Sequence, residues 1–246
     1  RPGLTLHGVA EPLERAFTMS KTPSVAIVIN SPGGSPVQSS LIFKRIRQLA
    51  DENKKKVYVF CEDVAASGGY YLAVAGDEIY ADASSIVGSI GVIFAGFGFE
   101  KAIEKLGIER RVYTAGTSKN ALDAFLPEKV EDVARIKQVQ GDIHDVFISV
   151  VKDRRAGRLR APDDELFSGA FWAAARALDL GLIDGVSEVR AKMRQIHGDK
   201  VVLKSIPLSS GGLLGRLRRG GLAGDLPPLL SADDALATLE ARSLWA

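Results

Sequence analysis

Two apolar segments, each followed by a glycine-rich turn, constrain the fold of this chain most strongly. Residues 25–30 form a continuous apolar run that ends at an asparagine, which is typical of a strand covered on both faces. Residues 31–34 read Ser-Pro-Gly-Gly and predict a turn, after which apolar side chains recur at helical spacing up to Leu49. A second apolar run follows at residues 57–61. A strand, a turn, a helix and a second strand in this order predict a parallel α/β architecture.

The same patterns predict the remaining elements. Ser35 is expected to cap the first helix, because Gln38 follows at the spacing of a capping box. Pro127 suits the first turn of a long amphipathic helix that runs to about Arg155. Further helices are expected at 68–75, 99–106, 170–178 and 187–196, and further strands near 78–80, 88–94 and 108–114.

Composition places the chain among ordinary globular proteins. Of its 246 residues, 46% are apolar and 25% are charged, and the net charge of +2 gives no strong field for nucleic acid. The one cysteine, Cys61, excludes an internal disulfide and a cysteine-rich metal site. No signal peptide and no apolar run of about 18 residues or more is found. Because the first residue is Arg1 rather than methionine, we expect a trimmed product or part of a longer one.

The composition changes near residue 206. From residue 208 to 224 the chain is rich in glycine, serine and arginine, and two prolines follow. We therefore expect one main domain over residues 1–206 and a flexible tail over 207–246, with a short amphipathic segment at 232–245.

Ser67 is the candidate nucleophile. It lies between small residues after the second apolar run, in the segment Ala-Ala-Ser-Gly-Gly-Tyr-Tyr. A turn there exposes the hydroxyl and places the amide of Gly68 beside it, and Gly33 and Gly34 are the natural source of a second oxyanion donor. The alternative is that Ser67 only caps a helix and that both glycine pairs are only turns.

The pattern gives poor support to a histidine as the general base. The three histidines are His7, His144 and His197, and none lies in a glycine-rich turn or at a strand end. A neutral lysine can act instead, and Lys119 differs from the other lysines because small residues surround it in a loop. An exposed loop lysine without a catalytic role is the alternative. Asp123 counts against Lys119 as a neutral base, since a nearby carboxylate raises the pKa of a lysine.

Taken together, five segments resemble the signal peptide peptidase A family of serine proteases, which includes protease IV and SohB-type members. The resemblance covers roughly residues 20–195. The segments that carry it are Ile29–Ser35, Ala65–Tyr71, Gly88–Val92, Gly116–Lys119 and Leu180–Asp184.

The resemblance implies an α/β Clp protease/crotonase-like fold, built of repeated β-β-α units with mostly parallel strands. It implies a Ser-Lys dyad in which Ser67 is the nucleophile and Lys119 the base. The amides of Gly34 and Gly68 would form the oxyanion hole, and the hydroxyl of Ser89 would orient the lysine. Family members place the serine and the lysine on opposite sides of a subunit boundary, so a homo-oligomer with a shared site is expected.

The expected activity is a serine endopeptidase that cleaves hydrophobic peptides, such as remnant signal peptides or membrane-protein fragments. No metal, organic cofactor or nucleic acid is implied. Family members commonly carry a membrane anchor, so we expect membrane association facing the bacterial periplasm or the cell exterior; a cytoplasmic location is the alternative because no anchor is seen. The alternative functions are a crotonase-type acyl-CoA enzyme and a catalytically silent scaffold of the same fold.

Overall fold

The computed structural model describes residues 3–208 of the chain, so the predicted tail segment at 232–245 lies outside the described residues. Within them one sheet of six strands runs in the order β5-β4-β2-β3-β6, and β1 also pairs with β2. Every pairing is parallel except that of β4 with β5. The strands are β1 (Ser24–Ser31), β2 (Lys56–Ala66), β3 (Glu78–Ala81), β4 (Ile86–Gly88), β5 (Phe171–Ala173) and β6 (Gly185–Val186).

β2 is the central strand because it is long enough to pair with three others. β1 runs beside most of its length. β3 pairs with Tyr58–Cys61, and β4 pairs further along the same strand with Val64–Ala66. The carboxyl ends of β1, β2 and β4 therefore meet at one edge of the sheet, which is where open α/β sheets place their sites.

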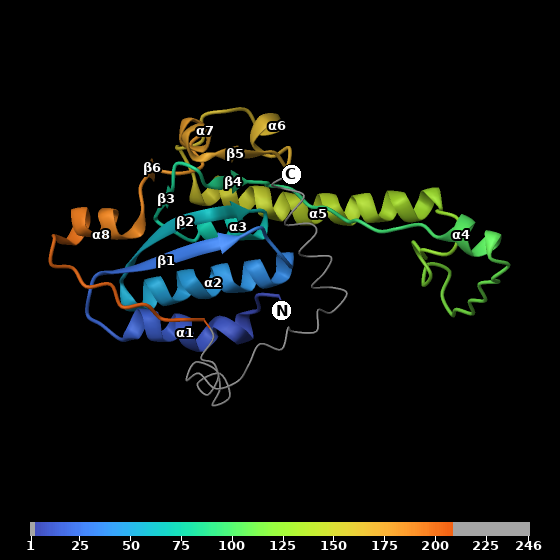
Figure 1. The fold of residues 1–246 in the computed structure, drawn as a ribbon, viewed down its shortest axis with the longest axis horizontal. Helices are drawn as coiled ribbons and strands as arrows, with labels where there is room; N and C mark the ends of the chain where they lie inside the picture. Colours follow the sequence, from blue (N-terminus) through green and yellow to red (C-terminus); the bar gives the residue numbers. More distant parts are fainter. Residues whose placement is uncertain (1–2, 209–246) are drawn as a thin grey trace, which may run out of the picture.

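Helices cover the sheet and extend beyond it (Figure 1). The eight helices among the described residues are α1 (Leu6–Thr18), α2 (Pro36–Asn53), α3 (Gly68–Ala73), α4 (Glu100–Lys105), α5 (Val130–Arg154), α6 (Asp163–Leu166), α7 (Ala174–Asp179) and α8 (Val189–His197). Within residues 3–208, none of these helices combines the length and the apolar character needed to cross a membrane.

The core confirms the mixed α/β prediction. The first apolar run contributes Val25 and Ile29, the second contributes Val57 and Val59, and the buried faces of α1, α2 and α3 pack on them. A smaller cluster lies beneath α8, where Met193 packs with three aromatic rings of β2 and β3. The sheet is thus covered by α1, α2 and α3 on one face and in part by α8 on the other, where Val28 of β1 remains 46% exposed.

Residues 92–129, here called the arm, leave the sheet after β4 and return to it through α5 (Figure 1). α4 lies in the arm and has no buried residue. The large apolar side chains of this region are turned to solvent: Ile93 is 87% exposed, Phe97 71%, Leu106 72%, Tyr113 92% and Val130 81%. The buried apolar residues of α5 are Phe147 and Val151, both near its carboxyl end.

Several predicted details of secondary structure are wrong. Ser35 makes no side-chain cap, and Gln38 instead accepts a hydrogen bond from the amide of Leu6 in α1, a helix that was not predicted. The predicted strand at 108–114 has no regular structure, because it lies in the arm with no strand beside it. The predicted helix at 170–178 begins with β5, which pairs with β4 before α7 starts.

Candidate active site

Ser67 occupies a strained turn between β2 and α3. Its φ of 50° and ψ of −122° lie outside the regions that non-glycine residues normally adopt. Two hydrogen bonds hold this conformation: its amide donates to Gly88 O at 2.8 Å, and its carbonyl accepts from the amide of Tyr71 at 2.9 Å. Strain that is held in this way is characteristic of functional sites and of the elbows that carry nucleophilic serines.

The side chain of Ser67 does not cap the helix that follows it. Its hydroxyl is half-buried and forms no hydrogen bond with another described residue. The position therefore lacks the feature on which the helix-cap interpretation depends. A free hydroxyl on a fixed backbone is what a nucleophile requires.

The tertiary structure brings the Gly33–Gly34 turn directly against Ser67. A Cβ on Gly33 would lie 2.9 Å from Ser67 Cβ and 3.2 Å from Ser67 Oγ, so a larger residue does not fit there. The φ of Gly33 is +128°, a conformation that L side chains rarely adopt. Sequence reasoning paired these two segments, and the structure confirms that they touch.

Two backbone amides at this contact are available to a ligand. A Cβ on Gly68 would lie 3.1 Å from the amide nitrogen of Gly34, so the two glycines face each other. Within residues 3–208 neither amide donates a hydrogen bond to a protein acceptor. Paired unengaged N–H groups beside a serine hydroxyl are the elements of an oxyanion hole.

Ser39 is a residue of this site that sequence reasoning missed. It is buried on the first turn of α2, and its hydroxyl donates to Ser35 O at 3.1 Å. Its Oγ lies 2.6 Å from where a Cβ on Gly68 would stand, so Ser39 packs directly against the turn at Gly68. A polar residue on the otherwise apolar face of a predicted helix is the sequence signal that could have found it.

Ser89 is the first residue after β4, the strand that pairs with the end of β2 just before Ser67. It also has a positive φ, of 52°, and its amide donates to Ala170 O at 2.7 Å. The preceding Gly88 has a φ of +115°, and a Cβ there would meet the ring of Trp172 at 2.9 Å. The β4–β5 pairing thus fixes the backbone of Ser89 beside that of Ser67.

Lys119 lies apart from this cluster. It belongs to the arm, between α4 and α5, and is exposed. Figure 1 shows this part of the chain projecting away from the sheet at the far end of α5. Within the described residues no hydrogen bond or ion pair engages Lys119 Nζ, and its amide closes a turn by donating to Gly116 O at 3.2 Å. The structure therefore brings Ser67, Gly34, Gly68 and Ser89 together, and does not bring Lys119 to them within one chain.

Two of the three histidines have hydrogen-bond partners of their own. His144 Nε2 lies 2.9 Å from Ile90 O and donates to it, while His197 Nε2 lies 2.7 Å from Ser24 Oγ. Burial raises the pKa of the Cys61 thiol to about 12, so the thiolate is absent at neutral pH. Cys61 therefore does not supply a competing nucleophile.

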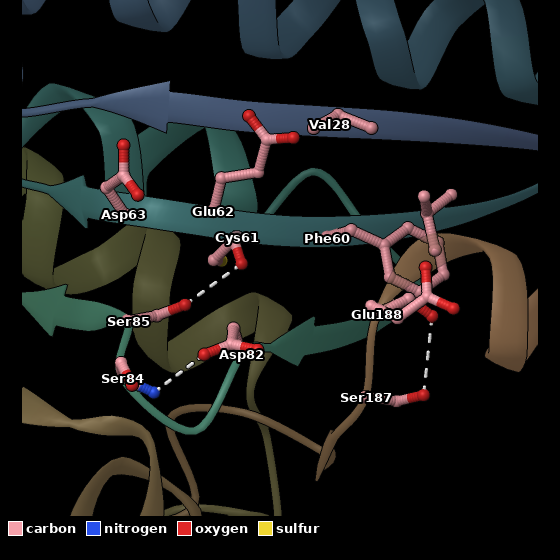
Figure 2. Close-up of a pocket in the computed structure, with 11 residues that line it drawn as sticks. Val28, Phe60, Cys61, Glu62, Asp63, Asp82, Ser84, Ser85, Ser187 and Glu188 are labelled. Carbon is pink, nitrogen blue, oxygen red and sulfur yellow. Dashed lines mark hydrogen bonds between the residues drawn. The ribbon is translucent and has the colours of Figure 1, made fainter.

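A separate pocket of about 380 Å³ opens beside β2 and β3 (Figure 2). Three of its four acidic side chains are already used locally: Asp63 accepts from Asn30, Asp82 accepts from the amide of Ser84, and Glu188 caps α8. None of the predicted site residues lines it. Within the part of the chain that the structure describes, no group of three His, Cys, Asp or Glu side chains is arranged to hold a metal ion.

The sequence model of peptidase family S49 matches residues 50–202, which is more than half of the chain. The chain belongs to peptidase family S49. The S49 match includes Ser67, Ser89 and Lys119, and it begins at residue 50, after Gly34. It confirms the family that the sequence motifs indicated, and with it the mixed α/β fold.

Individual relatives of this S49 domain carry several names. A Na(+)/H(+) antiporter NhaA of Brucella abortus is 54% identical over 252 aligned residues, covering 100% of this chain and 34% of that protein. The chloroplastic serine protease SPPA of Arabidopsis thaliana is 33% identical over 88% of this chain and 31% of that protein. Protease 4 of Haemophilus influenzae is 31% identical over 72% of the chain and 28% of that protein. The chain spans about a third of the length of these relatives.

Proposed function

We propose that this S49 domain is the catalytic part of a serine endopeptidase with a Ser-Lys dyad, in which Ser67 is the nucleophile and Lys119 the general base. The observation that carries the proposal is the contact between two turns. The hydroxyl of Ser67 is held in a strained turn against Gly33, beside the unengaged amides of Gly34 and Gly68. These groups are what acyl transfer from a peptide carbonyl needs.

The proposed reaction proceeds through an acyl-enzyme. Neutral Lys119 accepts the proton of Ser67 as its Oγ attacks the scissile carbonyl carbon. The amides of Gly34 and Gly68 donate to the oxyanion, and the leaving amine takes the proton back from the lysine. Water then attacks the ester with Lys119 again as the base, which regenerates the Ser67 hydroxyl. In this scheme the hydroxyl of Ser89 hydrogen-bonds Lys119 and orients it.

The dyad is proposed to form between subunits of a homo-oligomer. The arm carries Lys119 away from the Ser67 of its own chain (Figure 1). The same arm exposes large apolar side chains, with Tyr113 92% exposed and Ile93 87%. Exposed apolar surface of this kind marks an interaction site. A second copy of the chain would bury it and would receive Lys119 at its own Ser67.

The proposed substrates are hydrophobic peptides, such as remnant signal peptides or fragments of membrane proteins. We propose that the protein acts at a membrane, on its periplasmic or outer side. The antiporter name of relatives that match the whole chain supports a location beside a membrane. Hydrophobic peptides are the substrates that such a location supplies.

Hydrolysis of an apolar peptide by three proteins tests the dyad: the wild type, Ser67→Ala and Lys119→Ala. Each variant should lose at least about 10³-fold in kcat/KM, because the two residues act as a unit. A serine-directed covalent inhibitor should label the wild type at Ser67. Full activity of either variant contradicts the dyad. Binding of a coenzyme A thioester would instead favour the crotonase-type enzyme, and a folded, assembled protein that does not react with the inhibitor would favour the silent scaffold.

A further inference from the structure

The strand that leads to Ser67 contains a bulge. Along the first part of the β1–β2 pairing, Ile29 lies opposite Cys61, which is 32 positions later in the chain. Two residues further along β1, Ser31 lies opposite Ala65, which is 34 positions later. Between these two pairs β1 has one residue where β2 has three, so β2 carries two extra residues. Bulges bend a strand and re-aim the side chains that follow, and they are over-represented next to active sites.

The bulge decides which residue of β2 meets the Gly33–Gly34 turn. Gly33 contacts Ser67, which is 34 positions later, and this is the register found after the bulge. With the register found before the bulge, Gly33 would lie opposite Ala65 instead. A shift of two residues along a strand amounts to about 6.6 Å, at about 3.3 Å per residue. That distance is longer than a hydrogen bond, so the amides of the turn reach a carbonyl at Ser67 only in the shifted register.

The side chain of Asn30 spans the bulge. Asn30 is the residue of β1 that lies between the two registers. Its Nδ2 donates to Asp63 Oδ2 at 2.7 Å, and its Oδ1 accepts from the amide of Val64 at 3.4 Å. An asparagine side chain carries the carbonyl and N–H groups of a peptide unit. Asn30 therefore bonds to β2 at the level where β1 has no further residue to offer.

The sequence and the neighbours of β2 both change at the bulge. Glu62 and Asp63 are exposed and acidic, whereas the segments 57–61 and 65–66 of the same strand are buried (Figure 2). On its other side β2 pairs with β3 before the bulge and with β4 after it. The segment that carries Ser67 is thus set off from the rest of the strand, and the bulge is the joint between them.

The Asn30–Asp63 bond is suited to hold geometry rather than stability. Both residues are exposed. Changes at exposed positions usually alter the free energy of unfolding little, so the buried sheet does not depend on this bond. A displacement of about 1 Å at reacting groups, in contrast, can lower a rate by about 10²-fold. Loss of the bond should therefore affect the site more than the fold.

We infer that Asn30 is a positioning residue for the proposed nucleophile: its bond to Asp63 fixes the β2 bulge, and the bulge places Ser67 against the Gly33–Gly34 turn. The inference rests on the proposed function, in which Ser67 attacks a peptide carbonyl. Loss of the bond lowers the rate of acylation in this account. A bond that only supported the fold would change stability and leave that rate as it is.

The test measures three quantities in the full, assembled chain: kcat and KM for hydrolysis of an apolar peptide, and the rate at which a fluorophosphonate labels Ser67. Asn30→Ala should lower kcat and the labelling rate by about 10-fold to 100-fold, because the hydroxyl and the oxyanion donors no longer stand in register. KM should stay within about twofold of the wild type, since the lost alignment acts in the transition state.

Exchange of the two side chains gives a sharper test. Asn30→Asp by itself places two carboxylates against each other, so kcat should fall at least as far as in Asn30→Ala. In the double variant Asn30→Asp/Asp63→Asn, the new amide at position 63 donates to the new carboxylate at position 30. That carboxylate still accepts from the amide of Val64. The kcat of the double variant should return to within about threefold of the wild type, as expected for a pair that acts as a unit.

Controls separate position from charge and from loss of structure. Glu62→Gln removes the neighbouring carboxylate of the bulge, which is not the partner of Asn30, and kcat should stay at its wild-type value. Urea denaturation and sedimentation establish that each variant folds and assembles. If one of the two Asn30 single variants does not assemble, the other one and the double variant still decide the outcome.

Two different failures can be told apart. If Ser67→Ala remains fully active, Ser67 is not the nucleophile and the inference falls with the proposed function. If Ser67→Ala is inactive but Asn30→Ala keeps the wild-type kcat and labelling rate, the nucleophile stands and the role of Asn30 is refuted. A double variant that stays as slow as Asn30→Asp refutes the role of Asn30 as well.

Discussion

The amide of Ser67 donates a 2.8 Å hydrogen bond to the carbonyl oxygen of Gly88. This bond continues the parallel pairing of β2 with β4, in which Ala66 lies opposite Gly88. Immediately beyond it, Ser67 and Ser89 both turn into positive φ, at 50° and 52°. Two serines therefore leave neighbouring strands with nearly the same positive φ at one edge of the sheet. The amide of Ser67 is held by Gly88 of β4, and the amide of Ser89 by Ala170, the residue just before β5.

A site shared between subunits predicts complementation between inactive variants. Ser67→Ala and Lys119→Ala subunits, mixed and allowed to exchange, should regain about a quarter of wild-type activity if one neighbour completes each site. When equal amounts of the two subunits assemble at random, about a quarter of the sites combine a wild-type serine with a wild-type lysine. Peptide hydrolysis after mixing measures it, with the Ser67→Ala/Lys119→Ala double variant as the partner that cannot complement. Mixtures that stay inactive despite confirmed exchange would place both residues of the dyad in one chain.

The close contact at Gly33 predicts a selective loss of activity. In Gly33→Ala the new Cβ would stand 2.9 Å from Ser67 Cβ, at a φ of +128°. The turn must shift, and kcat/KM should fall by at least about 10²-fold because the oxyanion donors move with it. Gly141→Ala is the matched control: that position is exposed in α5, with nothing within 4 Å of a Cβ. It should keep full activity and gain about 0.5–1 kcal/mol in the free energy of unfolding. Equal activity losses in both variants would show that the contact at Gly33 is not the cause.

The lowered pKa of Asp77 predicts how the free energy of unfolding depends on pH. Burial alone would raise the pKa of Asp77, but donation from the amide of Val57 and the guanidinium groups of Arg47 and Arg154 outweighs it and lowers the pKa. A carboxyl whose folded pKa is depressed stabilises the fold above its unfolded pKa of about 3.9, and this contribution is lost as pH falls through the folded pKa. In Asp77→Asn the free energy of unfolding should be lower than in the wild type at pH 7. The difference should shrink below about pH 4, as measured by urea denaturation.

Asp51→Asn is the control for this experiment. Asp51 pairs with Arg47 at 3.3 Å, but its side chain is 74% exposed. An exposed pair of this kind contributes little, so its removal should leave the pH dependence close to that of the wild type. A difference between wild type and Asp77→Asn that stays constant from pH 7 to pH 3 would mean that the charge of Asp77 is not what stabilises the fold.

Much of the fold could be predicted because the strands carry strong local signals. The runs that became β1 and β2 are apolar on both faces, and only a covered sheet accommodates them. The strand at 108–114 was predicted wrongly from the same kind of signal. The segment does contain apolar side chains, but no strand lies beside it among residues 3–208. The helix α1 was missed because its contacts, such as the bond from Leu6 to Gln38, join residues far apart in sequence.

The residue types at the site follow from the sequence by itself. Gly33 and Gly68 stand where only glycine tolerates the contacts, and Ser67 follows an apolar strand, so residue types and spacing identified one half of the proposed site. Their approach to one another depends on the parallel pairing of β1, β2 and β4, which only the tertiary structure decides. It also decided the place of Lys119. The long α5 and the arm carry this residue away from the sheet, and the large apolar side chains of the arm remain exposed among the described residues. Local sequence determines which backbone turns can form, whereas packing between distant segments determines which turns meet.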